Sequence, residues 1–257
     1  MFSEDVASFY VAEVFLALTA LHKQGIVYRD LKPENCLLDA EGHLLLTDFV
    51  QTVIYSTNYK GLSKVADEDA DCKSFCGTCE YMAPEMCMGN SYSYEVDYWA
   101  MGVLLFELLT GSPPFTGNNN RIISDRIVKT KLKLPYYLSP DGKDLLTKLL
   151  KKVPSARLGS KPGDIQKIKQ HRFFRKINWT KLEKREMEPP IRPVITDPAE
   201  AENFPRFNGM QLPNSPPVNG TGNFGKQSDG VGSLGRSLFS GFTYTASSSF
   251  IDRFLGK

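Results

Sequence analysis

The spacing of apolar residues predicts a buried helix near the start of the chain. Ser3 can cap this helix, whose first turn carries Glu4 and Asp5, where negative charge suits the helix dipole. Gly25 marks its expected end. Its apolar residues nearly encircle the helix axis: Phe9, Tyr10, Ala12, Phe15, Leu16, Ala20 and Leu21. We therefore expect it to pack against several neighbours rather than lie on the surface.

Two short apolar runs predict a β-hairpin. Between Cys36–Leu38 and Leu44–Leu46 lies Asp39-Ala40-Glu41-Gly42, the composition of a hairpin with a four-residue loop. From Ser91 to Ser155 the pattern becomes helical. It holds a buried segment at Trp99–Leu109 and an amphipathic one at Gly142–Leu150. Leu145, Leu146, Leu149 and Leu150 share one face of the latter. This half is expected to be a helical bundle.

The character of the chain changes after about Trp179. Four prolines, at 189, 190, 193 and 198, indicate an extended segment. Residues 208–237 are rich in Gly, Asn, Ser and Pro and have few groups to bury, which favours a flexible tail. An aromatic island at Leu238–Tyr244 then indicates a docking peptide.

Composition and charge limit the classes of partner. The 257 residues are 41% hydrophobic and 23% charged, enough for one or two globular domains. A net charge of +2 is too near neutral to indicate binding to nucleic acid or a membrane surface through bulk charge. We find no signal peptide and no run long enough to insert into a membrane, since the most apolar stretch, Trp99–Leu109, contains Glu107. The expected location is the cytoplasm, with the nucleus as the alternative.

The five cysteines have no regular spacing, which favours reduced thiols over a disulfide framework. Cys72, Cys76 and Cys79 lie close enough to suggest a metal site. No His is nearby and a fourth ligand is missing, so ordinary thiols are the favoured interpretation.

The loop before the hairpin carries the strongest chemical signal, Tyr28-Arg29-Asp30-Leu31-Lys32-Pro33-Glu34-Asn35. Phosphoryl transfer needs a base for the hydroxyl proton, a cation beside the moving phosphate and oxygen ligands for magnesium. One turn-shaped loop can direct Asp30, Lys32 and Asn35 at one point. The alternative is a surface loop, where these residue types are ordinary.

This stretch resembles the catalytic loop of the AGC group of Ser/Thr protein kinases, closest to the ribosomal-protein kinases, with Tyr in place of the usual initial His. The resemblance implies ATP and Mg²⁺ as cofactors, Asp30 as base and Lys32 supporting the phosphoryl group. It places Asn35 and Asp48 as metal ligands, Asp48 because Leu46–Phe49 resembles the start of the Asp-Phe-Gly motif. Glu34 lies in the same nucleotide and substrate region and is expected to favour Arg-containing substrates.

The Asp-Phe-Gly motif is interrupted in this chain. Residue 50 is Val, and the sequence Gly61-Leu62-Ser63-Lys64 resembles the normal continuation. We interpret Val50–Lys60 as an insertion, and its position and codon-compatible edges suggest a translated intron. The alternative is a natural Gly-to-Val change followed by a long loop.

Ser74–Glu85 resembles the kinase activation segment. The family pattern implies phosphorylation at Ser74, paired with Arg29, and a catalytic bridging role for Thr78 toward Asp30 and Lys32. It also implies two structural roles. Glu85 is expected to form a buried ion pair with Arg157, and Asp97 to brace the catalytic loop by accepting backbone N–H bonds.

The tail resembles the C-terminal extension of the AGC group. Asn178-Trp179 and Glu188–Pro193 match its start, Ser215 the turn-motif phosphosite, and Thr243 the phosphorylated position of the hydrophobic motif. The expected partners are upstream activating kinases and protein substrates with basic residues before the Ser or Thr, without nucleic acid.

The resemblance predicts a protein-kinase-like fold. We expect a mainly α-helical C-terminal lobe with a small hairpin over residues 1–174, then an extended, partly disordered extension over 175–257. The sequence shows no Gly-rich loop, strand lysine or partner glutamate, so the N-terminal lobe is expected to be absent. The expected activity is Ser/Thr phosphorylation in growth-type signalling, weak or absent in this chain by itself. The alternative is a non-catalytic fragment that binds substrates or upstream kinases.

Overall fold

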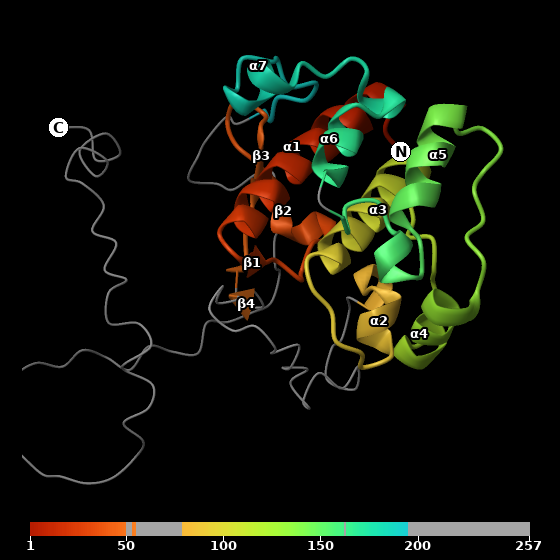
Figure 1. Ribbon diagram of the computed structural model, residues 1–257. Helices are drawn as coiled ribbons and strands as arrows, with labels where there is room; N and C mark the ends of the chain where they lie inside the picture. Colours follow the sequence, from red (N-terminus) through yellow and green to blue (C-terminus); the bar gives the residue numbers. More distant parts are fainter. Residues whose placement is uncertain (50–52, 55–78, 162, 195–257) are drawn as a thin grey trace, which may run out of the picture. The chain divides into compact units, whose positions relative to one another are not determined.

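The computed structural model describes residues 1–49, 53–54, 79–161 and 163–194, and helices dominate them (Figure 1). The described residues form seven α-helices: α1 (Glu4–Lys23), α2 (Pro84–Cys87), α3 (Glu95–Thr110), α4 (Asn120–Lys129), α5 (Pro140–Leu149), α6 (Asp164–Lys169) and α7 (Trp179–Glu183). They also form four short strands: β1 (Ile26–Val27), β2 (Cys36–Leu38), β3 (Leu44–Leu46) and β4 (Val53–Ile54). Single 3-10 turns lie at Pro33–Asn35, Cys79–Tyr81, Pro154–Ala156 and Arg172–Phe174.

Helix α1 begins and ends where the sequence predicts. The Ser3 hydroxyl accepts a hydrogen bond from the Val6 N–H, and Gly25 takes a φ of 76° directly after the helix. Its buried residues surround the axis: Ala7, Ser8, Phe9, Tyr10, Val11, Ala12, Val14, Phe15, Leu18 and Thr19. Ala20 differs from the prediction, because it is exposed and lines an open cavity beside Lys23.

The expectation that no run could span a membrane was wrong on length and composition. Helix α1 is long and apolar enough to qualify, the one such helix in the part of the chain that the structure describes. However, 56% of the relevant window is buried inside the fold. Its apolarity is therefore accounted for by its place in the core.

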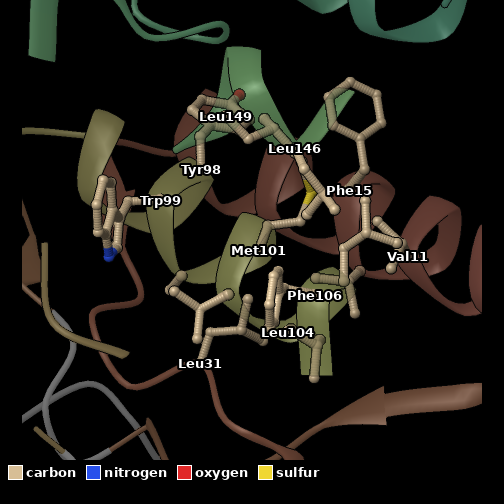
Figure 2. Close-up of a cluster of buried hydrophobic side chains, with 14 of the residues drawn as sticks. Val11, Phe15, Leu31, Tyr98, Trp99, Met101, Leu104, Phe106, Leu146 and Leu149 are labelled. Atoms are coloured by element: carbon tan, nitrogen blue, oxygen red, sulfur yellow. The ribbon is translucent and has the colours of Figure 1, made fainter. Parts of the chain in front are cut away.

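The core lies between α1, α3 and α5 (Figure 2). Helix α3 is buried almost all round, from Val96 to Leu109, whereas α5 buries one face through Leu145, Leu146 and Leu149. A Cβ at Gly102 would lie 2.9 Å from the Cβ of Leu149, so glycine permits the close approach of α3 and α5. Burying each large apolar side chain contributes about 1.5–3 kcal/mol. The predicted helical half is confirmed.

The predicted hairpin is also confirmed, with a loop one residue longer. Strands β2 and β3 pair antiparallel, with Leu37 opposite Leu45, and five residues, Asp39–His43, join them. A second antiparallel pair joins β1 to β4, with Val27 opposite Val53. This pair was not predicted. It gives two residues of the expected Val50–Lys60 insertion a place in a sheet; the origin of that segment stays a prediction.

The first residues that follow the predicted lobe pack on the same core. The Trp179 ring contacts Phe15 and Phe174, with centroids 5.6 and 5.4 Å away, and Leu182 is buried. Farther along, Tyr10 Oη donates to the carbonyl oxygens of Gly42 and Ile191. The predicted flexible tail and its aromatic island lie outside the described residues.

Candidate active site

One buried carboxylate binds the backbone of the catalytic loop. Asp97, in the first turn of α3, accepts hydrogen bonds from the backbone N–H groups of Tyr28 (2.9 Å) and Arg29 (2.8 Å). His22 Nε2 lies 2.7 Å from the same carboxylate. Asp97 is 0% exposed, so these partners and the positive end of α3 compensate its charge. The bracing contacts implied by the resemblance are therefore present.

Arg29 adopts a strained backbone that this anchor stabilises. Its φ is 71°, a region that costs a non-glycine residue about 1–3 kcal/mol. Its guanidinium lies over the Tyr92 ring at 5.4 Å, and its Nε is buried without a hydrogen-bond partner within the described part of the chain. A partly buried cation with an unmet donor is suited to an anionic partner.

Three predicted site residues converge in space. Lys32 Nζ lies 2.9 Å from Asp30 Oδ2, and Asn35 Nδ2 donates to the same oxygen at 2.9 Å and to the Asp30 carbonyl at 2.8 Å. Asp30 is 8% exposed and Asn35 5%, so the cluster opens to solvent through a small area. The two donors hold the Asp30 carboxylate in one orientation.

Asp48 reaches this region because the hairpin returns the chain to Asn35. The backbone N–H of Thr47 donates to the Asn35 carbonyl at 3.0 Å, and the Tyr28 hydroxyl donates to the Thr47 carbonyl. Asp48 itself has a φ of 56°, which aspartate tolerates better than most residues. Its side chain is exposed, and the Phe49 ring beside it contacts Tyr28 edge-on at 5.4 Å.

The donor set suits magnesium better than a softer metal. The Asp30, Asn35 and Asp48 side chains offer carboxylate and amide oxygens, and magnesium binds one or two carboxylates together with substrate phosphates and water. No group of three or more His, Cys, Asp or Glu residues forms a metal site among the described residues. The residues present thus fit a magnesium–nucleotide complex better than a metal held by protein alone.

A second buried carboxylate anchors the end of the activation segment. Glu85 receives both terminal nitrogens of Arg157, at 2.6 and 2.9 Å, and both side chains are at most 2% exposed. Arg157 also donates to the Glu95 and Lys151 carbonyls, and its guanidinium lies 5.2 Å from the Trp99 ring centre. Every face of this cation is engaged, which makes the pair a fixed point between α2 and α3.

An acidic group lies beside the catalytic loop and was not predicted. The Tyr81 hydroxyl donates to the Glu107 carboxylate on α3. Burial first, then the hydrogen bond to Glu107 and more weakly the charge of Glu34, raises the pKa of Tyr81. Glu107 is the one charged residue in the apolar run Trp99–Leu109, and that isolation was the signal that could have identified it.

Other connections carried no comparable signal. The His22 ring bonds Asp97, and Glu13 links α1 to the hairpin through His43 Nδ1 (2.5 Å) and the Leu44 N–H (2.8 Å). Each pair is far apart in sequence, so only the folded chain reveals it.

The remaining predicted positions lie outside the described residues: Ser74, Thr78, Ser215, Thr243, Cys72 and Cys76. Cys79 is buried, and none of Cys36, Cys79 and Cys87 forms a disulfide within the described residues.

Comparison with known proteins agrees with this geometry. Residues 1–174 match the family model described as the protein kinase domain. The chain is 44% identical over 217 residues to the serine/threonine-protein kinase AtPK2/AtPK19 of Arabidopsis thaliana, covering 84% of this chain and 44% of the relative. It is 42% identical over 251 residues to ribosomal protein S6 kinase alpha-3 of Homo sapiens, covering 97% and 31%. With ribosomal protein S6 kinase beta of Caenorhabditis elegans the identity is 44% over 250 residues, covering 96% and 42%.

The chain spans less than half the length of these relatives. The match nevertheless covers the catalytic loop, the hairpin and the two buried carboxylates, Asp97 and Glu85, whose hydrogen bonds are described above. The chain therefore belongs to the protein kinase family, within the serine/threonine kinases and alongside the AGC-group ribosomal protein S6 kinases.

Proposed function

We propose that this chain supplies the catalytic-loop half of a kinase that transfers the ATP γ-phosphate to Ser or Thr of proteins carrying basic residues before the target. The observation that carries the proposal is the convergence of Asp30, Lys32 and Asn35 on one point, braced by Asp97. ATP with magnesium supplies the phosphoryl group and neutralises its charge.

Each residue takes a role that its contacts support. Asp30 accepts the proton of the substrate hydroxyl, and Lys32, held 2.9 Å from it, offsets the negative charge that gathers at the transferred group. Asn35 and the exposed Asp48 offer oxygens to magnesium. Thr78, for which the resemblance implies a bridge to Asp30 and Lys32, completes the proposed set.

The acidic group supports a preference for basic substrates. Glu34 is exposed at the loop, and Glu107 is nearby through Tyr81. The exposed Glu34 carboxylate would attract a guanidinium, with the charge of Glu107 adding to the attraction, and paired hydrogen bonds would orient it.

Arg29 supports regulation by phosphorylation at Ser74. Its partly buried guanidinium has an unmet donor, and a phosphate brings three acceptor oxygens. Such a contact would order the activation segment against the catalytic loop. Phosphorylation at Ser215 and Thr243 by upstream kinases is proposed from the tail resemblance alone.

The test compares the 257-residue chain with a chimera in which the N-terminal lobe of a ribosomal protein S6 kinase precedes it. Both are given labelled ATP, magnesium and a Ser peptide with or without Arg. The chimera is expected to phosphorylate the Arg peptide preferentially, and Asp30→Asn is expected to lower transfer at least 1000-fold. Asp125→Asn, an exposed change on α4, is the matched control. A folded chimera that is inactive, or that tolerates Asp30→Asn, would falsify the proposal.

A second candidate is a non-catalytic fragment that binds basic substrates, and the Glu34 and Glu107 carboxylates favour it. The chain alone is then expected to bind the Arg peptide without transferring phosphate. Glu107→Gln should weaken that binding, and Glu188→Gln, on an exposed segment, should not.

A further inference from the structure

The net charge of +2 conceals a strong segregation of charge along the chain. Residues 1–119 contain 6 Lys and Arg but 17 Asp and Glu, a net charge of −11. Residues 120–194 contain 20 Lys and Arg but 7 Asp and Glu, a net charge of +13. An excess of this size in one stretch of the sequence is an electrostatic feature that the overall charge does not report.

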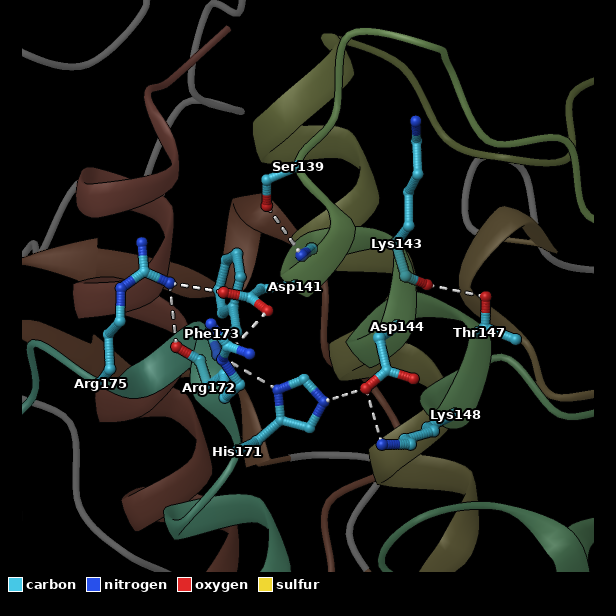
Figure 3. Close-up of polar contacts among 11 residues, drawn as sticks. Ser139, Asp141, Lys143, Asp144, Thr147, Lys148, His171, Arg172, Phe173 and Arg175 are labelled. Carbon is cyan, nitrogen blue, oxygen red and sulfur yellow. Dashed lines mark hydrogen bonds and ion pairs between the residues drawn. The ribbon is translucent and has the colours of Figure 1, made fainter.

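Three acidic residues of this basic stretch, Asp125, Asp141 and Asp144, are already engaged in ion pairs. Asp141 pairs with Arg172 and Arg175, while Asp144 pairs with Lys148 and His171. Figure 3 shows both carboxylates of α5 turned toward this cluster, with the Lys143 side chain extending away from it. Asp125 pairs with Lys129. These carboxylates therefore do not neutralise the lysines on the other side of α5.

Those lysines surround two exposed tyrosines in the segment between α4 and α5. Lysine and leucine alternate over residues 131–134, and Leu132 and Leu134 pack on the core. The alternation therefore directs the exposed Lys131 and Lys133 outward. Lys143 Nζ donates to the Tyr136 carbonyl at 2.8 Å. Neither Lys131 nor Lys133 has a carboxylate partner among the residues that the structure describes. We call Lys131, Lys133, Tyr136, Tyr137 and Lys143 the lysine–tyrosine patch.

The tyrosines are unusual for a surface without a partner. Tyr136 is 92% exposed and Tyr137 51%, and their rings meet edge-on at 5.7 Å. This arrangement leaves the faces of the Tyr136 ring open to solvent. The patch is also fixed in place, because Lys152 Nζ bonds the Val128 and Thr130 carbonyls at the start of the segment.

We propose that the lysine–tyrosine patch binds single-stranded nucleic acid. Lysines would neutralise backbone phosphates, and the open Tyr136 ring would stack on a base, the combination that non-sequence-specific single-strand binding uses. An anionic membrane is disfavoured because the patch exposes no large aliphatic side chain to insert. An acidic peptide would use the lysines but has no use for an exposed ring. The expectation of no nucleic-acid partner rested on net charge, which averages over the two oppositely charged parts.

The test measures fluorescence anisotropy of labelled 12-mer oligouridine and oligothymidine with the full 257-residue chain between 50 and 200 mM salt. Lys131→Glu with Lys133→Glu is expected to lower affinity at least tenfold and to reduce the slope of log affinity against log salt by about 1.4, since each phosphate contact contributes about 0.7. Tyr136→Ala is expected to lower affinity at least fivefold without changing the slope.

The matched control is Lys181→Glu with Lys184→Glu, the same charge change on α7, which is well separated from the patch in Figure 1. A loss there equal to that at the patch would mean bulk attraction and overturn the proposal. The proposal would also fail if the Tyr136→Ala variant bound the oligonucleotides as tightly as the original chain. That result would mean that the lysines alone attract the ligand, as expected if the natural occupant were an acidic peptide. Binding to phosphatidylserine vesicles through the patch, with no binding to either oligonucleotide, would also overturn it.

Discussion

Two buried carboxylates, Asp97 and Glu85, hold the candidate site from opposite sides, and they are compensated differently. Asp97 faces two backbone N–H groups and an imidazole at the start of a 16-residue helix. Glu85 faces one guanidinium with which it shares two short bonds. Dipoles spread over several groups compensate the first charge, whereas a single cation compensates the second.

This difference indicates how each anchor should fail. Removing the only counter-ion leaves a whole charge buried, whereas removing one of several dipoles leaves the others in place. The Glu85 anchor should therefore be the more fragile to a single substitution. The following changes test that ranking, in order of expected effect on the free energy of unfolding measured by urea denaturation.

Arg157→Met should cost the most, about 3–5 kcal/mol, because it leaves Glu85 buried without a partner. Adding Glu85→Gln to this variant should recover part of the loss, since no unpaired charge remains. Arg192→Met, which removes an exposed pair with Glu188, is the control and should change stability by less than about 0.5 kcal/mol. A loss no greater than that of the control would contradict the single-counter-ion account.

Asp97→Asn should cost about 2–3 kcal/mol. One amide oxygen can still accept a backbone N–H, but the amide nitrogen then faces the second donor. In the chimera described above, the variant should also lose activity, because Arg29 and Asp30 are no longer fixed. If Asp97→Asn destabilised the chain more than Arg157→Met, the proposed ranking of the two anchors would be reversed.

Alkaline pH should weaken the fold through its buried tyrosines, and Tyr98 is the one next to Asp97. Burial, assisted by the charge of Asp97, raises the pKa of Tyr98 to about 12 from its ordinary value near 10. The fold favours the neutral phenol of Tyr98. The contribution of Tyr98 to the free energy of unfolding is therefore complete below about pH 10 and is lost as the pH rises toward 12. The loss should be at most about 2–3 kcal/mol. Tyr98→Phe should flatten the stability curve between pH 10 and 12, and an unchanged slope would exclude Tyr98 as its source.

His22→Gln should have the smallest effect, about 1 kcal/mol, because Asp97 keeps both backbone donors. The glutamine amide can replace the lost contact in part. Circular dichroism during urea titration measures the change. A loss as large as that of Asp97→Asn would show that the imidazole, rather than the backbone dipoles, carries the compensation.

Sequence patterns predicted the features that depend on neighbouring residues. The cap at Ser3, the apolar surround of α1, the two hairpin strands and the leucine face of α5 all follow from local periodicity. Asp30, Lys32 and Asn35 were predictable as a set because they lie within six residues of one another.

Features that join distant residues could not be predicted from pattern alone. The Tyr81–Glu107 and Glu13–His43 contacts span 26 and 30 residues. The β1–β4 pair was hidden because strands of two residues carry no periodicity. Deleting Val50–Lys60 would place Lys64 and Val65 at the same distance from Phe49 as Val53 and Ile54, so sequence spacing alone permits either pair opposite β1.

The packing of Trp179 bears on where this lobe physically ends. The match to the protein kinase domain model ends at residue 174. Beyond it, Trp179 covers Phe15, and Ile191 lies so close to Gly42 that a methyl group there would collide with the Ile191 carbonyl oxygen. A chain cut at 174 would lose one wall of its interior and expose the side of α1 that this wall shields. The stretch matched by the domain model is thus shorter than the packed unit, which includes Trp179, Leu182 and Ile191.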